Sequence, residues 1–115
     1  MKVLLHIDEA SKWQMVVNNA KNLLVYIMEN KIEDYEIEIV ANGPVVKDLV
    51  KGSNEELVTE LNKLMERKVV VAACKNALNS NDIAVDELLK GIKVVPAAIA
   101  ELIVKQEEGF AYVKP

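Results

Sequence analysis

The chain contains one cysteine and one histidine, and these two side chains are its best candidates for chemistry. Cys74 closes the apolar segment 69–73, VVVAA, and His6 lies near the end of another, KVLLHI. If a helical turn begins after Cys74, its free amides and positive dipole end favour the nucleophilic thiolate. The same cysteine can equally be a small hydrophobe that closes a buried strand. The sequence leaves both interpretations open.

The surroundings of these two residues add further candidates. Imidazole acts readily as a base or a hydrogen-bond donor, although a lone histidine at a strand end is more often structural. Asp8 follows His6 by two positions, and Lys75 places a positive charge beside Cys74. Zinc requires three or four ligands, and His6, Asp8 and Cys74 are too few for such a site. We therefore expect no metal.

The segment Asn42-Gly43-Pro44 predicts a turn, because all three residue types favour turns. Its functional interpretation is a loop whose backbone amides face a ligand, and its simpler interpretation is a plain chain reversal. Neither GxGxxG nor GxxxxGK[ST] occurs, and a single cysteine excludes a CxxC dithiol. We expect no cofactor.

Alternating strands and helices must position these residues. Apolar segments at 2–7, 35–41, 69–73, 92–95 and 110–113 predict strands, of which 69–73 is apolar throughout, as in a central parallel strand. The alternating segment 35–41 suits a strand near one edge, and the carboxylates of EDYEIE (33–38) are interpreted as a solvated face. Apolar spacing predicts helices at 12–30, from Ser53 onward and at 96–108, with short helical turns between.

This alternation predicts an α/β fold: a doubly wound, five-stranded parallel sheet with helices on both faces. With right-handed crossovers the expected strand order is 2-1-3-4-5. Ligands of such sheets bind at the carboxyl ends of the strands where the order reverses, here between the first and third strands. We therefore expect His6, Asp8 and Cys74 in one crevice, with the Asn42-Gly43 turn opening onto the same end.

Bulk properties limit the function classes. A length of 115 residues suits a single domain, 1–115. The net charge of −4, without a Lys/Arg cluster, argues against a nucleic-acid partner. The longest uncharged apolar run, VVVAAC, is far shorter than the roughly 20 residues of a membrane span. With one cysteine and no charged-then-apolar leader, we expect a cytoplasmic protein without a membrane partner.

The segment 73–115, which begins ACKNALNSND and ends QEEGFAYVKP, resembles the carboxyl-terminal half of the DsrE/DsrF-like family of small sulfur-relay proteins. The similarity continues upstream in LLHID, KNLL (21–24) and VANGPVVKDL (40–49). The combination of Cys-x-Asn-x-Leu, LL-x-G-hydrophobic and Q-x-x-G-aromatic is fairly specific. One departure is Asp82 before Ile83, where many relatives have glycine; aspartate tolerates the left-handed backbone conformation better than most residues.

The resemblance implies a flavodoxin-like fold, homo-oligomers that are trimers or hexamers, and in some members a cysteine that carries sulfur as a persulfide. Cys74 matches the position of that cysteine, and Asn76 belongs to the same motif. Such a sulfurtransferase-like relay has donor and acceptor proteins as partners. The alternative is a non-catalytic oligomeric module that binds a small anion or a protein partner in the same crevice. In both cases the expected binding residues are His6, Asp8, Asn42, Gly43, Lys75 and Asn76.

Overall fold

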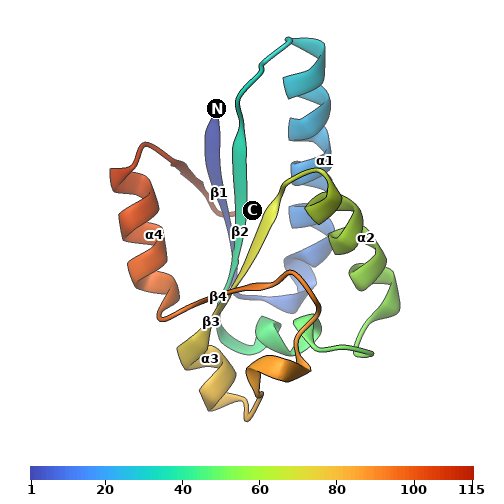
Figure 1. Ribbon diagram of the computed structural model, residues 1–115, viewed down its shortest axis with the longest axis vertical. Coiled ribbons are helices and arrows are strands. Elements are labelled where there is room, and N and C mark those ends of the chain that lie inside the picture. The colour runs from blue at the N-terminus through green and yellow to red at the C-terminus, as the bar shows by residue number, and fades with distance from the viewer.

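The computed structural model describes residues 1–115 and contains one sheet of five parallel strands (Figure 1). The order across the sheet is β4-β3-β2-β1-β5. The strands are β1 (Lys2–Ile7), β2 (Glu36–Ala41), β3 (Val70–Cys74), β4 (Lys93–Val95) and β5 (Ala111–Val113). The connections contain the helices α1 (Trp13–Glu29), α2 (Glu55–Glu66), α3 (Lys75–Ser80) and α4 (Ala98–Glu107), and the 3-10 segments η1 (Ala10–Lys12), η2 (Gly43–Leu49) and η3 (Val85–Glu87).

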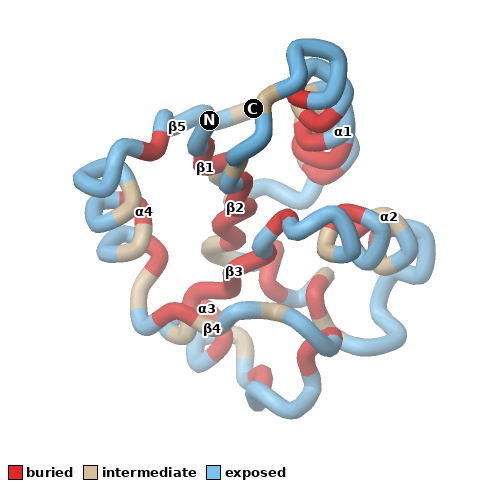
Figure 2. Tube along the Cα trace, turned by 45° about the horizontal axis from the view of Figure 1, so that its top comes forward, coloured by how far each residue is buried: buried red, intermediate tan, exposed pale blue.

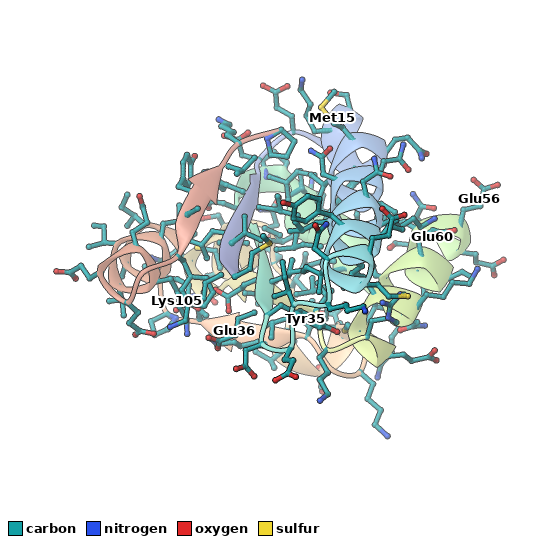
Figure 3. All side chains as sticks on the ribbon, turned by 90° about the horizontal axis from the view of Figure 1, so that it is seen from above. Met15, Tyr35, Glu36, Glu56, Glu60 and Lys105 are labelled. Carbon is teal, nitrogen blue, oxygen red and sulfur yellow. The ribbon has the colours of Figure 1, made fainter.

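Helices cover both faces of the sheet. Figure 1 shows α1 and α2 on one side of the strands and α4 on the other, with α3 beyond the carboxyl end of β3. The view from above in Figure 3 shows the same layers. In Figure 2 the central strands are largely buried, whereas the helices bury one side and expose the other. None of the helices combines the length and the hydropathy needed to cross a membrane.

The pleat of the strands decides which side chains lie under α4. His6 of β1 pairs with Val40 of β2, and Val40 pairs with Ala72 of β3. Because side chains alternate along a strand, these positions and every second residue from them point to one face. Contacts with α4 identify that face as the one it covers. Beneath α4 the face carries a carboxyl group, a thiol and an amine: Glu38, Cys74 and Lys93.

The five-stranded, doubly wound α/β fold is confirmed, but the predicted strand order 2-1-3-4-5 is wrong. The second strand lies between the first and the third, and β5 occupies the edge beside β1. The alternation of Glu36 and Glu38 with isoleucines suggested an edge position for this strand. In the structure Glu38 is only 3 % exposed, because Lys93 and α4 cover it. The interpretation of its carboxylate as part of a solvated face is therefore also wrong.

The observed order moves the point of reversal to a different pair of strands. From β1 to β4 the chain steps across the sheet in one direction, and after β4 it crosses back through α4 on the opposite face to reach β5. The neighbouring strands β3 and β4 therefore send their connections in different directions. In doubly wound sheets this is where a ligand crevice opens. Cys74, at the end of β3, borders this point, and His6 does not.

Candidate functional site

Cys74 is the last residue of β3, and its thiol is buried beneath the start of α4. The residue is 4 % exposed. The backbone N–H of Ala98, the first residue of α4, donates a hydrogen bond to Sγ at 3.4 Å. Cys74 is also the residue that precedes α3, but its side chain makes no capping bond to that helix. The predicted amide contact therefore comes from the helix after β4 and not from the turn after the cysteine.

The start of α4 has a definite physical character. The first amides of a helix have no intrahelical acceptor, and the helix dipole makes this end partially positive. The helix begins at Ala98 after the extended residue Ala97, two residues later than the predicted start at Pro96. One first-turn amide is directed at sulfur, so a negative charge that develops on Sγ is stabilised there. A helix-end amide of this kind favours a nucleophilic sulfur.

His6 has a separate environment on β1. Its Nδ1 and the hydroxyl of Tyr112, on β5, are 2.7 Å apart. Nε2 is buried and has no hydrogen-bond partner. Burial lowers the pKa of His6 below 6.5; the nearby carboxylate of Asp8 opposes this shift, and Lys114 adds to it. The imidazole is therefore neutral around pH 7.

The structure does not bring His6 and Cys74 together. Strand β2 lies between β1 and β3, so the two side chains are separated by two strand spacings, roughly 10 Å. In register, His6 is also level with Ala72, two residues before Cys74. The expected crevice between the first and third strands is filled by β2. A direct proton transfer between this imidazole and the thiol is excluded in this conformation.

The Asn42-Gly43 turn is adjacent to Asp8, as neighbouring strand ends require. A Cβ added at Gly43 would lie 3.8 Å from the backbone oxygen of Asp8, and the N–H of Asn42 donates to the oxygen of Ile7. The side-chain oxygen of Asn42 accepts from the N–H of Gly43 at 2.9 Å and caps η2. Both backbone donors are thus used within the fold. Among the other predicted binding residues, Lys75 is half-buried and Asn76 is exposed on α3.

A cluster that the sequence analysis did not identify lies under α4. The amine of Lys93, on β4, is 3.1 Å from Oε1 of Glu38 and 2.9 Å from Oε2 of Glu101, on α4. The other carboxyl oxygen of Glu38, Oε2, is buried and has no hydrogen-bond partner. Glu38 and Lys93 help to line a cavity of about 280 Å³. Tyr35, Glu36 and Lys105, labelled in Figure 3, line the same cavity.

The protonation states of these three side chains follow from their burial and from their charged neighbours. Burial is the largest cause that raises the pKa of Glu38 from 4.5 to about 7; the neighbouring carboxyl of Glu101 adds to the rise, and Lys93 opposes it. Burial also acts to raise the pKa of Glu101, but the neighbouring carboxyl of Glu38 and the hydrogen bond from Lys93 outweigh this effect, so the pKa of Glu101 is lowered. The cluster therefore holds a protonated Glu38 beside an ionised Glu101 and a charged Lys93 below neutral pH.

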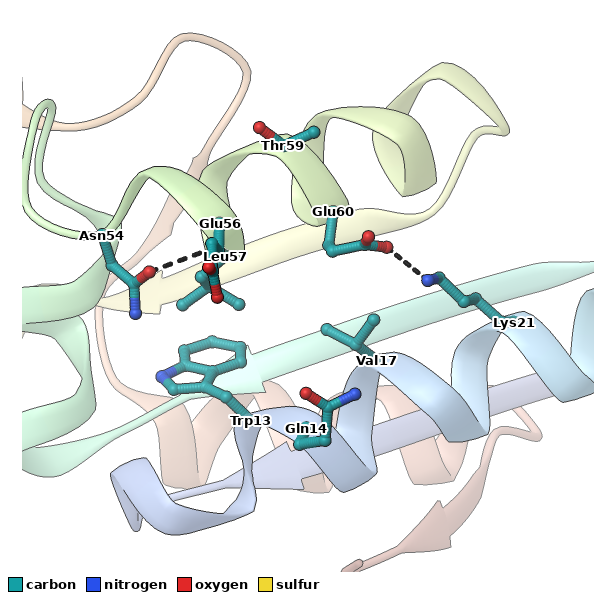
Figure 4. Close-up of a pocket in the computed structure, with 9 residues that line it drawn as sticks. All are labelled: Trp13, Gln14, Val17, Lys21, Asn54, Glu56, Leu57, Thr59 and Glu60. Carbon is teal, nitrogen blue, oxygen red and sulfur yellow. Dashed lines mark hydrogen bonds and ion pairs between the residues drawn. The ribbon is translucent and has the colours of Figure 1, made fainter.

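Another cavity, of about 420 Å³, lies between α1 and α2 on the opposite face of the sheet (Figure 4). Several of its polar side chains already have hydrogen-bond or ion-pair partners. Lys21 pairs with Glu60, and the Asn54 side chain accepts from the N–H of Leu57, as the dashed lines show. It contains neither a thiol nor an imidazole, so it is not the candidate site.

Comparisons with known proteins give the family of the chain. The model of the DsrE/DsrF-like family matches residues 8–115. No curated protein matches this chain. A protein of unknown function, MTH1491 from Methanobacterium thermoautotrophicum, is 31 % identical, with 99 % of this chain and 98 % of that chain covered and a TM-score of 0.87.

Two more distant solved structures share the fold alone. One is a conserved protein of unknown function, BT1422 from Bacteroides thetaiotaomicron, at 16 % identity and a TM-score of 0.69, covering 99 % of this chain and 94 % of that chain. The other is the ychN protein from E. coli, at 11 % identity and a TM-score of 0.63, covering 100 % and 99 %. Since the family model covers nearly all of the chain, this protein belongs to the DsrE/DsrF-like family.

Proposed function

We propose that this protein is a sulfur-relay protein in which Cys74 carries sulfane sulfur as a persulfide. One observation supports the proposal above the others: the only thiol of the chain lies at the reversal of strand order and receives an N–H from the first turn of α4. Membership of the DsrE/DsrF-like family agrees with a role of this type. No cofactor is required, because the chemistry is an exchange between sulfur atoms.

The proposed reaction has two balanced steps. The Cys74 thiolate attacks the outer sulfur of a donor persulfide, R–S–SH; a new S–S bond forms at Cys74, and the donor S–S bond breaks. The electron pair of that bond leaves on the donor as a thiolate, so the outcome is Cys74–S–SH and R–S⁻. An acceptor thiolate then attacks the outer sulfur in the same way. The amide of Ala98 stabilises the sulfur anion at Cys74 before the first step and after the second.

Access to the sulfur is the main requirement of this proposal. A side chain that is 4 % exposed is not available to a protein-bound persulfide, so the first turn of α4 must move away during transfer. Ala98 and Leu102 are the buried residues of α4, whereas its outer side is exposed and apolar, with Ile99, Ile103 and Val104. A helix with only two buried residues has few apolar contacts to break, so local opening costs less free energy there than in the core.

The proposed partners are donor and acceptor proteins and further copies of this chain. Exposed apolar side chains on α4 support an assembly, because such groups tend to lie in interfaces. The assembly is proposed to be a trimer or a hexamer, and sedimentation equilibrium distinguishes both from a monomer. A single reduced thiol also agrees with a cytoplasmic location.

Mass spectrometry of the intact protein tests the proposed function. After incubation with a persulfide donor and removal of small thiols, the protein should carry one added sulfur atom, which a reductant removes. Peptide mapping should place it on Cys74, and Cys74→Ser should carry none. Retention of one sulfur by the wild type with no transfer to any thiol acceptor would argue against a relay, and no added sulfur would argue against the persulfide itself.

A second function is favoured by the burial of the thiol. A non-catalytic oligomeric module that binds a small anion or a protein at the carboxyl ends of β3 and β4 needs no sulfur chemistry. In that case Cys74 is a core residue, and Cys74→Ser leaves binding unchanged. Binding of a labelled anion, or co-purification of a partner at equal levels with wild type and Cys74→Ser, distinguishes this function from the relay.

A further inference from the structure

The first turn of α4 is held on the sheet at two points that differ in chemistry. At its first residue the N–H of Ala98 donates to the sulfur of Cys74, at 3.4 Å. At its fourth residue Glu101 accepts from Lys93, which also donates to Glu38. Residues three apart lie on one side of a helix, so both contacts belong to the same turn and face the same sheet. Any force on Glu101 therefore acts on the amide that covers the thiol.

From this arrangement we infer that Glu38, Lys93 and Glu101 form a proton-dependent latch that holds the first turn of α4 over Cys74, so that loss of the shared proton exposes the thiol. The three residues act through Ala98 and do not touch the reacting sulfur, which makes them positioning residues. The inference rests on the proposed function only in giving the exposed thiol a role. The opening itself does not depend on what the thiol does.

Burial explains why one proton decides the state of the latch. Glu38 is 3 % exposed; Lys93 donates to its Oε1, whereas its Oε2 is buried without a hydrogen-bond partner. A protonated carboxyl places its hydrogen on this oxygen and donates toward the carboxylate of Glu101. A deprotonated Glu38 instead puts two carboxylates beside one amine. Repulsion then acts on Glu101, since Glu38 is fixed in a central strand and α4 is attached at few points.

The charged groups around Glu38 come from β4, from α4 and from the lining of the adjacent cavity. Strand β4 contributes Lys93, and α4 contributes Glu101 together with Lys105, whose charge acts on Glu101. The paired residues on β1 and β3 are the uncharged Leu4 and Val70. On the same face, His6 is two residues further along β1 than Leu4. Glu36 and Lys68 line the same cavity and are exposed to solvent.

The direction of the pH dependence follows from linkage. Glu38 binds its proton more tightly when the latch is closed than when the side chain is in water, where its pKa is ordinary. Raising the pH from about 4.5 to about 7 therefore favours the open state, and above this range both states have lost the proton. The fraction of molecules in which the latch is open should rise with pH and then level off. The ionisation of the thiol itself must be separated from this rise.

Alkylation of Cys74 by a neutral reagent, in the native protein, tests the latch. The rate constant is measured from about pH 5.5 to about pH 8.5 for the wild type and for Glu38→Gln, which mimics the protonated form. At each pH the rate constant of the wild type is divided by that of Glu38→Gln. Both proteins contain Cys74, so this ratio cancels the effect of thiol ionisation. We expect the ratio to rise about tenfold between pH 5.5 and pH 7 and to level off above about pH 8. A flat ratio overturns the latch.

Two further variants keep this test independent of any one mutation. Glu101→Gln removes the repulsion and should also abolish the rise, whereas Glu107→Gln, an exposed substitution on the same helix, should behave as the wild type. Amide hydrogen exchange at residues 98–101, corrected for the intrinsic pH dependence, should show the same pattern without using the thiol. If exchange stays equal in wild type and Glu38→Gln at all pH values, the latch is wrong. Because alkylation needs no persulfide, a failure here is distinct from a failure of sulfur loading.

Discussion

The N–H of Ala98 donates to Sγ of Cys74, joining the first residue of α4 to the last residue of β3. This contact defines the candidate site, because it places a helix amide against the only thiol of the chain. It also arises from topology: β3 and β4 are neighbours, and the chain leaves β4 directly into the helix that crosses the other face. A thiol at this position is covered whenever α4 is seated.

Replacement of Cys74 by alanine should therefore destabilise the protein. The change removes a buried side chain and leaves the N–H of Ala98 without an acceptor, at a cost of about 1–3 kcal/mol. The free energy of unfolding in urea, measured for wild type and Cys74→Ala, checks this. Asn76→Ala, an exposed change two residues away, is the control and should be nearly neutral. Equal stability of Cys74→Ala and wild type would show that the sulfur contact contributes nothing.

The sequence identified the elements better than their arrangement. The helical pattern at 12–30 corresponds to α1 at Trp13–Glu29, and the apolar segment 69–73 corresponds to β3. These signals are local, because apolar spacing depends on residues within one element. The strand order depends on contacts between distant residues. Glu38 resembles a solvent-facing residue of an edge strand until Lys93, 55 residues away, is placed above it.

The site residues that could be predicted are those whose position depends on local signals alone. Cys74 and the Asn42-Gly43 turn were placed at the carboxyl edge of the sheet because both follow strands, and that position holds for any parallel order. The meeting of His6 with Cys74 depended on the strand order and failed with it. Glu101 and Lys93 carried no local signal, since charged residues on a helix and at a strand start are usually solvated. Their role follows only from the position of α4.

Global stability should fall as the pH rises through the range in which Glu38 titrates. The pKa of this carboxyl is about 7 in the folded protein and 4.5 when exposed, so the folded state binds more protons between these values. The stabilisation is present in full below pH 4.5 and is lost by about pH 7. We expect a decrease of about 1–3 kcal/mol in the free energy of unfolding across this range.

Urea unfolding at several pH values measures this decrease in wild type and in Glu38→Gln. The amide cannot ionise, so the variant should lose most of the slope between pH 5 and pH 7. Glu66→Gln, at an exposed position on α2, should retain it. A slope that persists unchanged in Glu38→Gln would assign the pH dependence to other groups.

Removal of the amine of Lys93 should lower the free energy of unfolding more at high pH than at low pH. Lys93→Met leaves Glu38 and Glu101 facing each other without a cation. Below the pKa of Glu38 the pair still shares a proton, and above it two carboxylates repel. Since Lys93 is partly exposed, the expected extra loss is about 1–2 kcal/mol at pH 8 relative to pH 5.5. Lys68→Met, at an exposed position that lines the same cavity, provides the control. Equal losses of stability in Lys93→Met at both pH values would contradict the prediction.

The imidazole of His6 should titrate below the usual histidine range, and its neighbours should shift it in opposite directions. Burial is the largest cause of the lowered pKa, the carboxylate of Asp8 opposes it, and the ammonium of Lys114 adds to it. Asp8 and Lys114 pair with each other at 3.1 Å, so their effects partly cancel in the wild type. NMR titration of the only histidine gives the value without assignment ambiguity.

Single substitutions separate the two charges. Asp8→Asn should lower the pKa of His6 further, because the remaining ammonium of Lys114 disfavours the imidazolium. Lys114→Met should raise it, because the carboxylate of Asp8 is then unopposed. Tyr112→Phe removes the 2.7 Å contact with Nδ1 and tests whether the hydroxyl orients the ring. Shifts of the same sign in Asp8→Asn and Lys114→Met would mean that burial changes, and not charge, control this histidine.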